Sequence, residues 1–199
     1  MKKIIGIYGL SGAGKTTFCT FLKELGCTVV DVDEIGRKIL EKGSEGLSKV
    51  VKLFGEDILF PDGSLNRKKL GGIVFADAEK LGLLNSVTKP AIEKELLKII
   101  KKAKGITVID GALVNSLEAV KENCDEIILL TADRDLLISR IIKREGLDEK
   151  SAADRIERQI ESFSENCTGR IENNGDLEEL KKKAERMIKY VSQGRTIDL

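Results

Sequence analysis

Short apolar runs alternate along the chain with longer segments in which apolar residues recur every three or four positions. The short runs are rich in Ile, Val and Leu, and they fall at about residues 4–8, 27–32, 106–109, 126–131 and 170–172. Strands that alternate with helices build a parallel sheet that is covered on both faces. The pattern therefore predicts an α/β fold with a five-stranded parallel sheet.

Helical spacing accounts for most of the remaining sequence. The predicted helices fall at about residues 16–25, 33–40, 44–54, 66–75, 77–84, 90–104, 136–144, 149–163 and 176–191, with a further one before residue 126. Pro90 is expected to open its helix, because proline suits the first turn, where its missing N–H is not needed. The stretch between the second and third strands is too long for a simple crossover. We therefore expect a helical insertion at about residues 44–104 within a single domain, residues 1–199.

The first predicted strand runs directly into the octet Gly9-Leu10-Ser11-Gly12-Ala13-Gly14-Lys15-Thr16. Two glycines five positions apart, followed by Lys and Thr, fit the phosphate-binding loop, or P-loop, between a strand and a helix. Gly9, Gly12 and Gly14 are expected to allow the positive φ angles and the close phosphate approach that such a loop needs. The pattern indicates a protein that binds a nucleoside triphosphate.

The roles of the loop residues follow from this geometry. The backbone N–H groups from Gly12 through Ala13 and Gly14 to Lys15, Thr16 and Thr17 are expected to hold phosphate oxygens at the start of a helix. The Lys15 ammonium would reach the β- and γ-phosphates, and the Thr16 hydroxyl would ligate Mg²⁺. The expected cofactors are ATP and Mg²⁺, and the sequence leaves GTP open as the donor.

Carboxylates follow the second and third predicted strands. Ligands of an open α/β sheet collect beyond the carboxyl ends of its strands, where we expect Asp31, Asp33 and Asp110. Asp33 is expected to end the second strand, on this ligand edge, where its carboxylate would accept the proton of an attacking hydroxyl. The alternative for Asp31 and Asp33 is a helix cap. For Asp110 the sequence leaves both a place near Mg²⁺ and a structural cap open.

Arginines gather on the two charged helices after the fourth strand. Arg140 and Arg144 lie four residues apart and therefore share one helical face, with Arg134 before them and Arg155 and Arg158 on the next helix. Guanidinium groups on a mobile hairpin would stabilise the charge that spreads during phosphoryl transfer. The alternative is a solvated helix pair whose arginines have the surface partners Glu145, Asp148 and Glu157.

Composition narrows the classes of function. None of the 199 residues is His, which excludes Ser-His-Asp and Cys-His catalysis and any His-ligated zinc site. The 34 basic and 33 acidic residues give a net charge of +1, so we expect no nucleic-acid partner. Four Cys without Cys-x-x-Cys spacing, no signal-peptide pattern and no apolar run of spanning length are typical of a reduced cytoplasmic protein with no membrane partner.

Several motifs in one order carry a family resemblance across about residues 1–190. They are Gly9–Thr17, Val29–Asp33 with Arg37, Phe54-Gly55, Asp62–Arg67, Ile73–Phe75, Arg140 with Arg144-x-Gly146-Leu147, Arg155-Ile156-x-x-Gln159 and Asn173-Asn174-Gly175. In these motifs the chain resembles the dephospho-coenzyme A kinases. The resemblance implies a three-layer P-loop NTPase fold with a five-stranded parallel sheet, a helical substrate-binding insertion and a helical lid at about residues 134–164.

The resemblance also implies an activity and roles. ATP would phosphorylate the ribose 3′-hydroxyl of dephospho-CoA, the last step of coenzyme A synthesis, in a monomer or small homo-oligomer. Asp33 would be the base and Arg140 a lid arginine on ATP. Asn174, within residues 173–175, would lie near the adenine.

The chain departs from the family pattern at three places. It has Lys89-Pro90 in place of His-Pro, Ala112–Ser116 in place of Pro-Leu-Leu followed by an aromatic residue and Glu, and Cys167-Thr168 in place of Ala-Asp. All three are expected on the substrate or lid side. Two other functions therefore stay open: a P-loop kinase of another small acceptor, such as a nucleoside monophosphate, and a nucleotide-switch ATPase.

Overall fold

The computed structural model describes residues 2–112, 114–161, 163 and 166–195. The chain divides into two compact units, which are described separately. The core unit comprises Met1–Asp31 and Lys102–Leu199, and the insertion unit comprises Val32–Lys101. The single domain with an insertion at 44–104 and a lid at 134–164 stays a prediction, and residues 162 and 164 of that lid lie outside the described residues.

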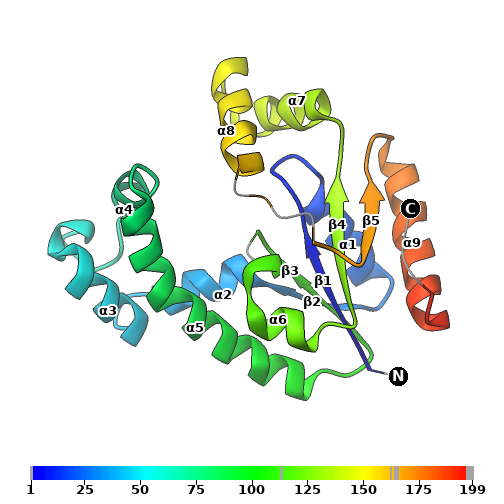
Figure 1. Cartoon of the computed structure of the whole chain (residues 1–199), viewed down its shortest axis with the longest axis horizontal. Coiled ribbons are helices and arrows are strands. Elements are labelled where there is room, and N and C mark those ends of the chain that lie inside the picture. Colours follow the sequence, from blue (N-terminus) through cyan, green and yellow to red (C-terminus); the bar gives the residue numbers. More distant parts are fainter. Residues whose placement is uncertain (1, 113, 162, 164–165, 196–199) are drawn as a thin grey trace. The chain divides into compact units, whose positions relative to one another are not determined.

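The core unit is built on a parallel sheet, as the sequence predicted (Figure 1). Its order is β2-β3-β1-β4-β5. The strands are β1 (Lys3–Tyr8), β2 (Thr28–Asp31), β3 (Ile106–Asp110), β4 (Glu126–Thr131) and β5 (Gly169–Glu172). The register pairs Asp31 with Asp110, and Asp110 with Ile7, so the two carboxylates stand at the strand ends from which the phosphate loop departs.

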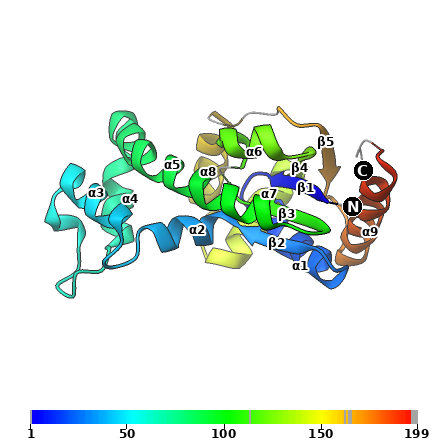
Figure 2. The same cartoon turned by 90° about the horizontal axis from the view of Figure 1, so that it is seen from below.

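Helices cover both faces of this sheet. Figures 1 and 2 show α1 (Lys15–Glu24) and α9 (Leu177–Gln193) side by side on one face and α6 (Glu118–Asn123), which follows the short helix η2 (Val114–Ser116), on the other. The helices α7 (Arg134–Glu145) and α8 (Glu149–Glu161) pack against each other. Buried residues of these two helices and of the strands form one apolar cluster. It includes Leu137, Ile141 and Ile156 from the helices and Ile5, Ile7, Val108 and Ile128 from the strands. The helical pair is therefore packed into the core.

The insertion unit is helical and has its own apolar core. It consists of α2 (Val32–Ile39), α3 (Glu45–Phe54), η1 (Glu56–Ile58), α4 (Arg67–Val74) and α5 (Ala78–Lys102). Side chains cap two of these helices, because Ser44 Oγ accepts the Leu47 N–H at 3.0 Å and Asn66 Oδ1 accepts the Lys69 N–H at 3.0 Å. The buried core residues are Leu40, Leu47, Val50, Ile58, Leu65, Leu70 and Val74.

The prediction of separate helices at residues 77–84 and 90–104 is wrong. A single helix, α5, runs through both segments with Pro90 in its interior. Its buried residues, Thr88, Ile92, Leu96 and Ile100, recur every four positions on both sides of the proline. Burial of this continuous stripe outweighs the loss of one backbone hydrogen bond at Pro90, which costs about 3 kcal/mol in a helix interior.

The strand predicted at residues 27–32 is shorter in the structure, and Asp33 therefore belongs to a helix. The strand β2 ends at Asp31, and α2 begins at Val32. Val32 and Ile35 are buried three positions apart, which is helical spacing, so apolar burial sets the start of the helix earlier than the β-rich sequence indicated. Asp33 therefore lies exposed in the first turn of α2 and does not end a strand.

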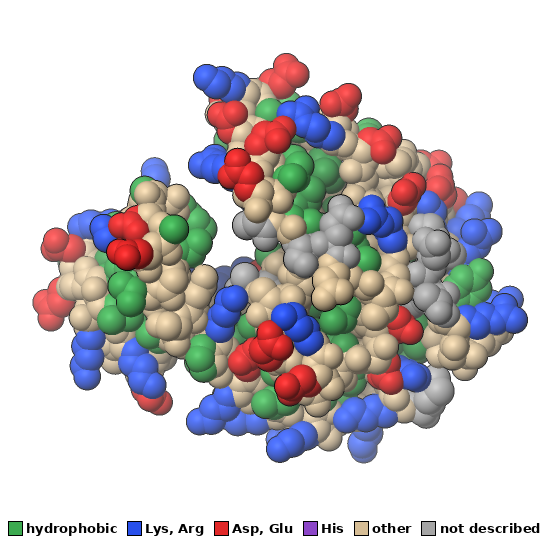
Figure 3. Space-filling view, in the orientation of Figure 1, with side chains coloured by type: hydrophobic (Ala, Val, Ile, Leu, Met, Phe, Trp, Pro, Cys, Tyr) green, Lys and Arg blue, Asp and Glu red, His purple; other side chains and the backbone are tan. Residues whose placement is uncertain are grey.

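Two surface properties of the described residues bear on function. On the face seen in Figure 3, basic and acidic side chains are interspersed over both units, in keeping with their near-equal numbers. The helices of the described ranges include none with an apolar stretch sufficient to cross a bilayer.

A carboxylate ties β1 to the start of β4. Asp125 accepts the Ile4 N–H at 2.8 Å and the Lys3 ammonium at 2.9 Å, while its own N–H donates to the Ile4 carbonyl oxygen at 2.8 Å. Partial burial raises the pKa of Asp125, but the Ile4 hydrogen bond and the Lys3 contact outweigh it and lower this pKa below its ordinary value of 3.8. The ionised form is therefore the one that the fold stabilises.

We expect Asp125→Asn to lower the free energy of unfolding by about 1 kcal/mol at neutral pH, because the charge-assisted bonds are lost. A lowered folded-state pKa gives stability that is present above the unfolded pKa and lost as pH falls through the folded pKa. The difference in the free energy of unfolding between wild type and variant should therefore shrink below about pH 3.8. Urea unfolding at several pH values measures this difference. The control is Asp135→Asn, because the Asp135 side chain is 99% exposed. A pH-independent difference would contradict the argument.

Candidate functional site

The glycine-rich loop connects β1 to α1 in the core unit. Gly12 has φ 84° and Gly14 has φ 95°, a left-handed region that residues with a Cβ rarely adopt. The expectation of a positive φ at Gly9 is wrong, because that residue is not among the positive-φ glycines. Gly9 is required for a different reason. A Cβ there would stand 2.0 Å from the Leu130 carbonyl oxygen of β4, so the loop leaves the sheet with no space for a side chain.

Neighbouring elements hold the loop from outside. A Cβ on Gly12 would stand 2.6 Å from the Leu137 carbonyl oxygen of α7. Asn173, buried just after β5, donates its Nδ2 to the Ala13 carbonyl oxygen at 2.8 Å, and a Cβ on Gly14 would meet the same nitrogen at 2.4 Å. The Arg140 guanidinium donates to the Gly12 carbonyl oxygen at 3.4 Å. Packing and hydrogen bonds to the carbonyl groups thus fix the loop conformation.

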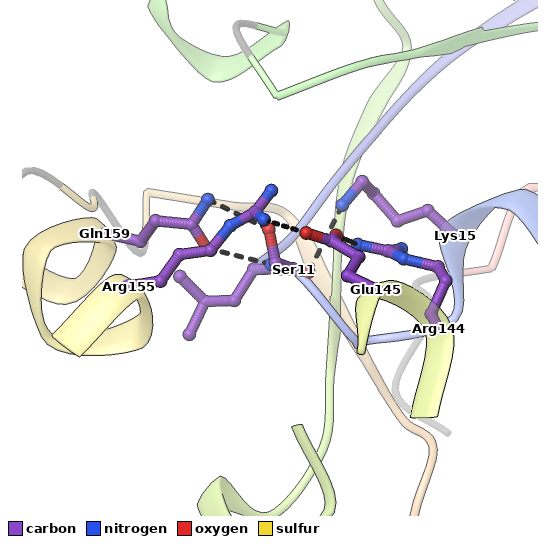
Figure 4. Close-up of polar contacts among 7 residues, drawn as sticks. Ser11, Lys15, Arg144, Glu145, Arg155 and Gln159 are labelled. Atoms are coloured by element: carbon purple, nitrogen blue, oxygen red, sulfur yellow. Dashed lines mark hydrogen bonds and ion pairs between the residues drawn. The ribbon is translucent and has the colours of Figure 1, made fainter. Parts of the chain in front are cut away.

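The start of α1 supplies donors for an anion. Gly14 is the N-cap and Lys15 the first helical residue, so the N–H groups of Lys15, Thr16 and Thr17 lie in the first turn, at the positive end of the helix dipole. The Lys15 ammonium donates to the carbonyl oxygens of Gly9 at 2.6 Å and Leu10 at 3.2 Å, which keeps its charge within the loop (Figure 4). Thr16 is exposed and Thr17 half-buried.

A glutamine of α8 contacts the tip of the loop. Gln159 Oε1 accepts the Ser11 N–H at 2.9 Å, and Gln159 Nε2 donates to Ser11 Oγ at 3.0 Å (Figure 4). The side chain thus satisfies both polar groups of one loop residue. The helix that the sequence assigned to the lid is joined directly to the phosphate loop.

Three other arginines of α7 and α8 form ion pairs with glutamates, whereas Arg158 donates to the Asp154 carbonyl oxygen at 3.1 Å. Arg144 and Arg155 both bind Glu145, each at 2.5 Å (Figure 4), and Arg134 binds Glu157 at 2.6 Å. The hydrogen bond from Arg144, together with the charges of both arginines, lowers the pKa of Glu145 against the opposing effect of burial. Two of the three surface partners expected in the alternative reading therefore pair with arginines.

The third expected partner, Asp148, has a different contact. Its carboxylate accepts the Ser151 N–H at 2.9 Å and the Ser151 hydroxyl at 2.6 Å, at the start of α8. Of the two lid arginines predicted to bind nucleotide, Arg140 contacts the loop, and Arg144 contacts Glu145.

Asn174, next to Asn173, forms two hydrogen bonds with Asp133. Its Oδ1 accepts the Asp133 N–H at 2.8 Å, and its Nδ2 donates to Asp133 Oδ1 at 2.9 Å. These bonds join the segment after β5 to the N-cap of α7. The expected place of Asn174 near the adenine stays a prediction.

The acidic edge is formed by strand ends of the core unit. Asp31 and Asp110 are paired across β2 and β3. The buried Cys19 thiol of α1 hydrogen-bonds Asp110, and burial, followed by the charge of this carboxylate, raises the pKa of Cys19, so that the thiol stays protonated. Within the described residues no group of three or more Cys, Asp or Glu could hold a metal by itself. A metal here would rely on Thr16, water and phosphate oxygens, a combination typical of Mg²⁺.

The three departures from the family pattern lie in different parts of the chain. Lys89 lies in α5, directly before the interior Pro90. Thr168 joins the first part of β5 to β4, because its Oγ1 accepts the Ile127 N–H at 2.9 Å and its N–H donates to the Ile127 carbonyl oxygen at 2.8 Å. Residue 113 of the 112–116 segment lies outside the described residues.

The site includes two residues for which the sequence predicted no individual role. Gln159 and Asn173 each hold a loop residue, and both belong to motifs already noted, Arg-Ile-x-x-Gln and Asn-Asn-Gly. Local sequence patterns could not predict these contacts, because the partners of Gln159 and Asn173 lie 148 and 160 residues away along the chain.

The family model and the curated relatives indicate one family. Residues 3–179 match the family model described as "Dephospho-CoA kinase". A dephospho-CoA kinase of Dehalococcoides mccartyi is 38% identical over 162 residues, which cover 79% of this chain and 80% of the relative. Among solved structures, a protein from Thermus thermophilus has a TM-score of 0.76 and 26% identity, with 97% of each chain covered. A dephospho-CoA kinase from Campylobacter jejuni has a TM-score of 0.62 and 25% identity, with 98% of this chain and 99% of that one covered.

We expect Asn173→Ala to lower the free energy of unfolding by about 2 kcal/mol, because the buried Ala13 carbonyl group loses its donor. The same change should weaken ATP binding about tenfold, since the loop is no longer fixed beside Gly14. Urea unfolding and calorimetry with MgATP measure the two effects. The matched control is Asn123→Ala, which removes a similar 2.8 Å bond to the Ala119 carbonyl oxygen in α6. Equal ATP affinity in wild type and Asn173→Ala would refute a role for Asn173 in the loop.

Proposed function

The chain belongs to the dephospho-CoA kinase family and phosphorylates dephospho-CoA with ATP, and we propose that Lys15, Asp33 and Arg140 carry out transfer to the ribose 3′-hydroxyl. The observation that carries the proposal is the strand–loop–helix at residues 9–16. Its glycine conformations, its Lys15 ammonium and the backbone N–H groups at the start of α1 fit a triphosphate.

The donor side of the reaction is assigned to the loop and α1. The backbone from Gly12 through Ala13 and Gly14 to Thr17 would bind the phosphates of ATP. The Lys15 ammonium is already held in the loop by the Gly9 and Leu10 carbonyl oxygens, so its charge needs little reorganisation to act on the transferred group. We assign Arg144 and Asn174 as further ATP contacts.

Mg²⁺ fits the residues at the start of α1. Thr16 is exposed there and would supply one hydroxyl ligand, while Mg²⁺ typically keeps several waters and takes phosphate oxygens as ligands. When bound, the metal neutralises charge on the β- and γ-phosphates. We assign Asp110, whose register pairs it with Ile7 of β1, to the same site, where it would accept hydrogen bonds from water at the metal.

The acceptor side is assigned to Asp33. It follows Asp31, the last residue of β2, by two positions, so the chain itself keeps its Cα within about 7 Å of that strand end. Its carboxylate would take the proton of the 3′-hydroxyl while the oxygen bonds to the γ-phosphorus and ADP leaves. With no His in the chain, a carboxylate is the natural base.

Arg140 is assigned to the transferring group. Its guanidinium binds the Gly12 carbonyl oxygen of the loop, and this contact supports the assignment. Positive charge there would stabilise the oxygens of the phosphoryl group as charge spreads over them. A cytoplasmic location, the absence of a nucleic-acid partner and a monomer or small homo-oligomer stay predictions.

The activity is tested by ADP release with dephospho-CoA as the only acceptor, coupled to a second assay that detects the 3′-phosphorylated product. We expect turnover that depends on ATP and Mg²⁺, and little turnover with a panel of nucleoside monophosphates. Faster transfer to a nucleoside monophosphate would overturn the assigned acceptor. ADP release without any acceptor, stimulated by a macromolecule, would favour a nucleotide switch.

We expect Asp33→Asn to lower kcat by a factor of about 10³, because the amide cannot take the hydroxyl proton. The Kd of MgATP should change less than about twofold, because Asp33 is assigned to the acceptor. Steady-state kinetics and calorimetry measure the two quantities. Glu34→Gln, which removes the neighbouring carboxylate in the same helical turn, is the matched control. Retained turnover in Asp33→Asn would show that the base is assigned wrongly.

A further inference from the structure

Gln159 is the point at which α8 meets the phosphate loop. It is half-buried, and both of its amide atoms bond Ser11, through the Ser11 N–H at 2.9 Å and Ser11 Oγ at 3.0 Å (Figure 4). Two bonds to one residue fix the orientation as well as the position of the loop tip.

The rest of α8 holds Gln159 in place. Ala152 and Ile156 are buried in the core of the unit, which anchors one side of the helix. Arg155 lies one turn before Gln159 and binds Glu145 of α7 at 2.5 Å. Past the end of the helix, the Phe163 ring contacts the ring of Tyr8, with centroids 5.4 Å apart. Tyr8 is the fully buried last residue of β1, so the α8 segment is anchored at both Tyr8 and Ser11.

The amide of Gln159 suits this position chemically. Ser11 presents a donor, its N–H, and a hydroxyl, and a glutamine offers an acceptor and a donor at the same time. A glutamate would bring acceptors only, together with a negative charge beside a site that binds a triphosphate. A methionine would fill a similar volume without either hydrogen bond.

The neighbouring loop residues are held by other elements. Arg140 of α7 binds the Gly12 carbonyl oxygen, and Asn173 after β5 binds the Ala13 carbonyl oxygen. Gln159 is the contact that reaches Ser11. Without Gln159, the residues on both sides of Ser11 would still be held, Leu10 by Lys15 and Gly12 by Arg140, but Ser11 itself would lose two hydrogen bonds.

We infer that Gln159 is a positioning residue for ATP: it fixes Ser11 so that the phosphate loop is preorganised for the triphosphate. The inference rests on the proposed function only in taking ATP as the ligand of the loop. Gln159 acts through Ser11, so its loss weakens ATP binding and leaves the acceptor contacts in place. An opposite role, in which Gln159 competes with phosphate for the Ser11 N–H, would make ATP bind more tightly once the glutamine is removed.

The test compares Gln159→Met, Gln159→Glu, Ser11→Ala and the double variant Ser11→Ala with Gln159→Met in the full chain. Calorimetry gives the Kd of MgATP, and steady-state kinetics give KM for ATP and for dephospho-CoA. Glu161→Gln, an exposed residue on the same helix, is the control. Thermal unfolding checks that each variant is folded at the assay temperature.

We expect Gln159→Met to raise the Kd of MgATP about tenfold, from the loss of two hydrogen bonds, and Gln159→Glu to raise it further. KM for dephospho-CoA should stay within about twofold of wild type. Because the two residues act as one unit, the double variant should bind MgATP at most about twofold more weakly than Gln159→Met.

Unchanged or tighter MgATP binding in Gln159→Met overturns the inference, and so does an additive double variant. If Gln159→Met is unfolded, Ser11→Ala and Gln159→Glu decide: MgATP affinity equal to wild type in both overturns it. Wild-type protein that binds MgATP with this variant pattern but does not phosphorylate dephospho-CoA would refute the proposed acceptor and leave the role of Gln159 standing.

Discussion

The phosphate loop depends on contacts that leave no space for side chains at its glycines. A Cβ at Gly9 or Gly12 would meet a backbone carbonyl oxygen, of Leu130 or Leu137, and a Cβ at Gly14 would meet the Asn173 amide. Backbone atoms within a packed core cannot move aside as the end of a flexible side chain can. The shape of the loop is therefore set by where β4, α7 and the segment after β5 are packed, and the nucleotide site follows from the core.

This arrangement makes the helical pair α7–α8 part of the support of the phosphate loop. The pair shares the apolar cluster of the sheet and reaches the loop through Arg140 and Gln159. Its remaining ion pairs are more open to water, since the side chains of Arg144 and Arg155 are 56% and 38% exposed. Exposed ion pairs contribute about 0–1 kcal/mol, so exchanging Glu145 for phosphate oxygens would cost little. The contacts of Arg140 and Gln159 thus hold the loop, whereas the ion pairs of Arg144 and Arg155 are weak.

The sequence predicted what depends on local pattern. The strand at 126–131 has the predicted bounds, and the parallel sheet and the loop between β1 and α1 are confirmed. The sequence prediction failed where burial in the folded chain outweighs a local preference. The helix α5 continues through Pro90 because its buried stripe does, and β2 ends at Asp31 because α2 begins at the buried Val32. The partners of Gln159 and Asn173 were beyond prediction, because they depend on how distant segments pack.

The position of Asp33 is compatible with its proposed role although it does not end a strand. Transfer through a loose transition state asks little covalent chemistry of the protein, so placing the acceptor oxygen matters more than strong basicity. A carboxylate in the first turn of a helix is held by backbone geometry, and the two-residue tether to Asp31 limits how far it can move from the sheet. Asp31 itself is fixed opposite Asp110, in the strand ends beside the loop. Two carboxylates of one short segment can thus have separate roles. Asp31 belongs to the edge of the sheet, and Asp33, two residues later, is the one proposed to act on the acceptor.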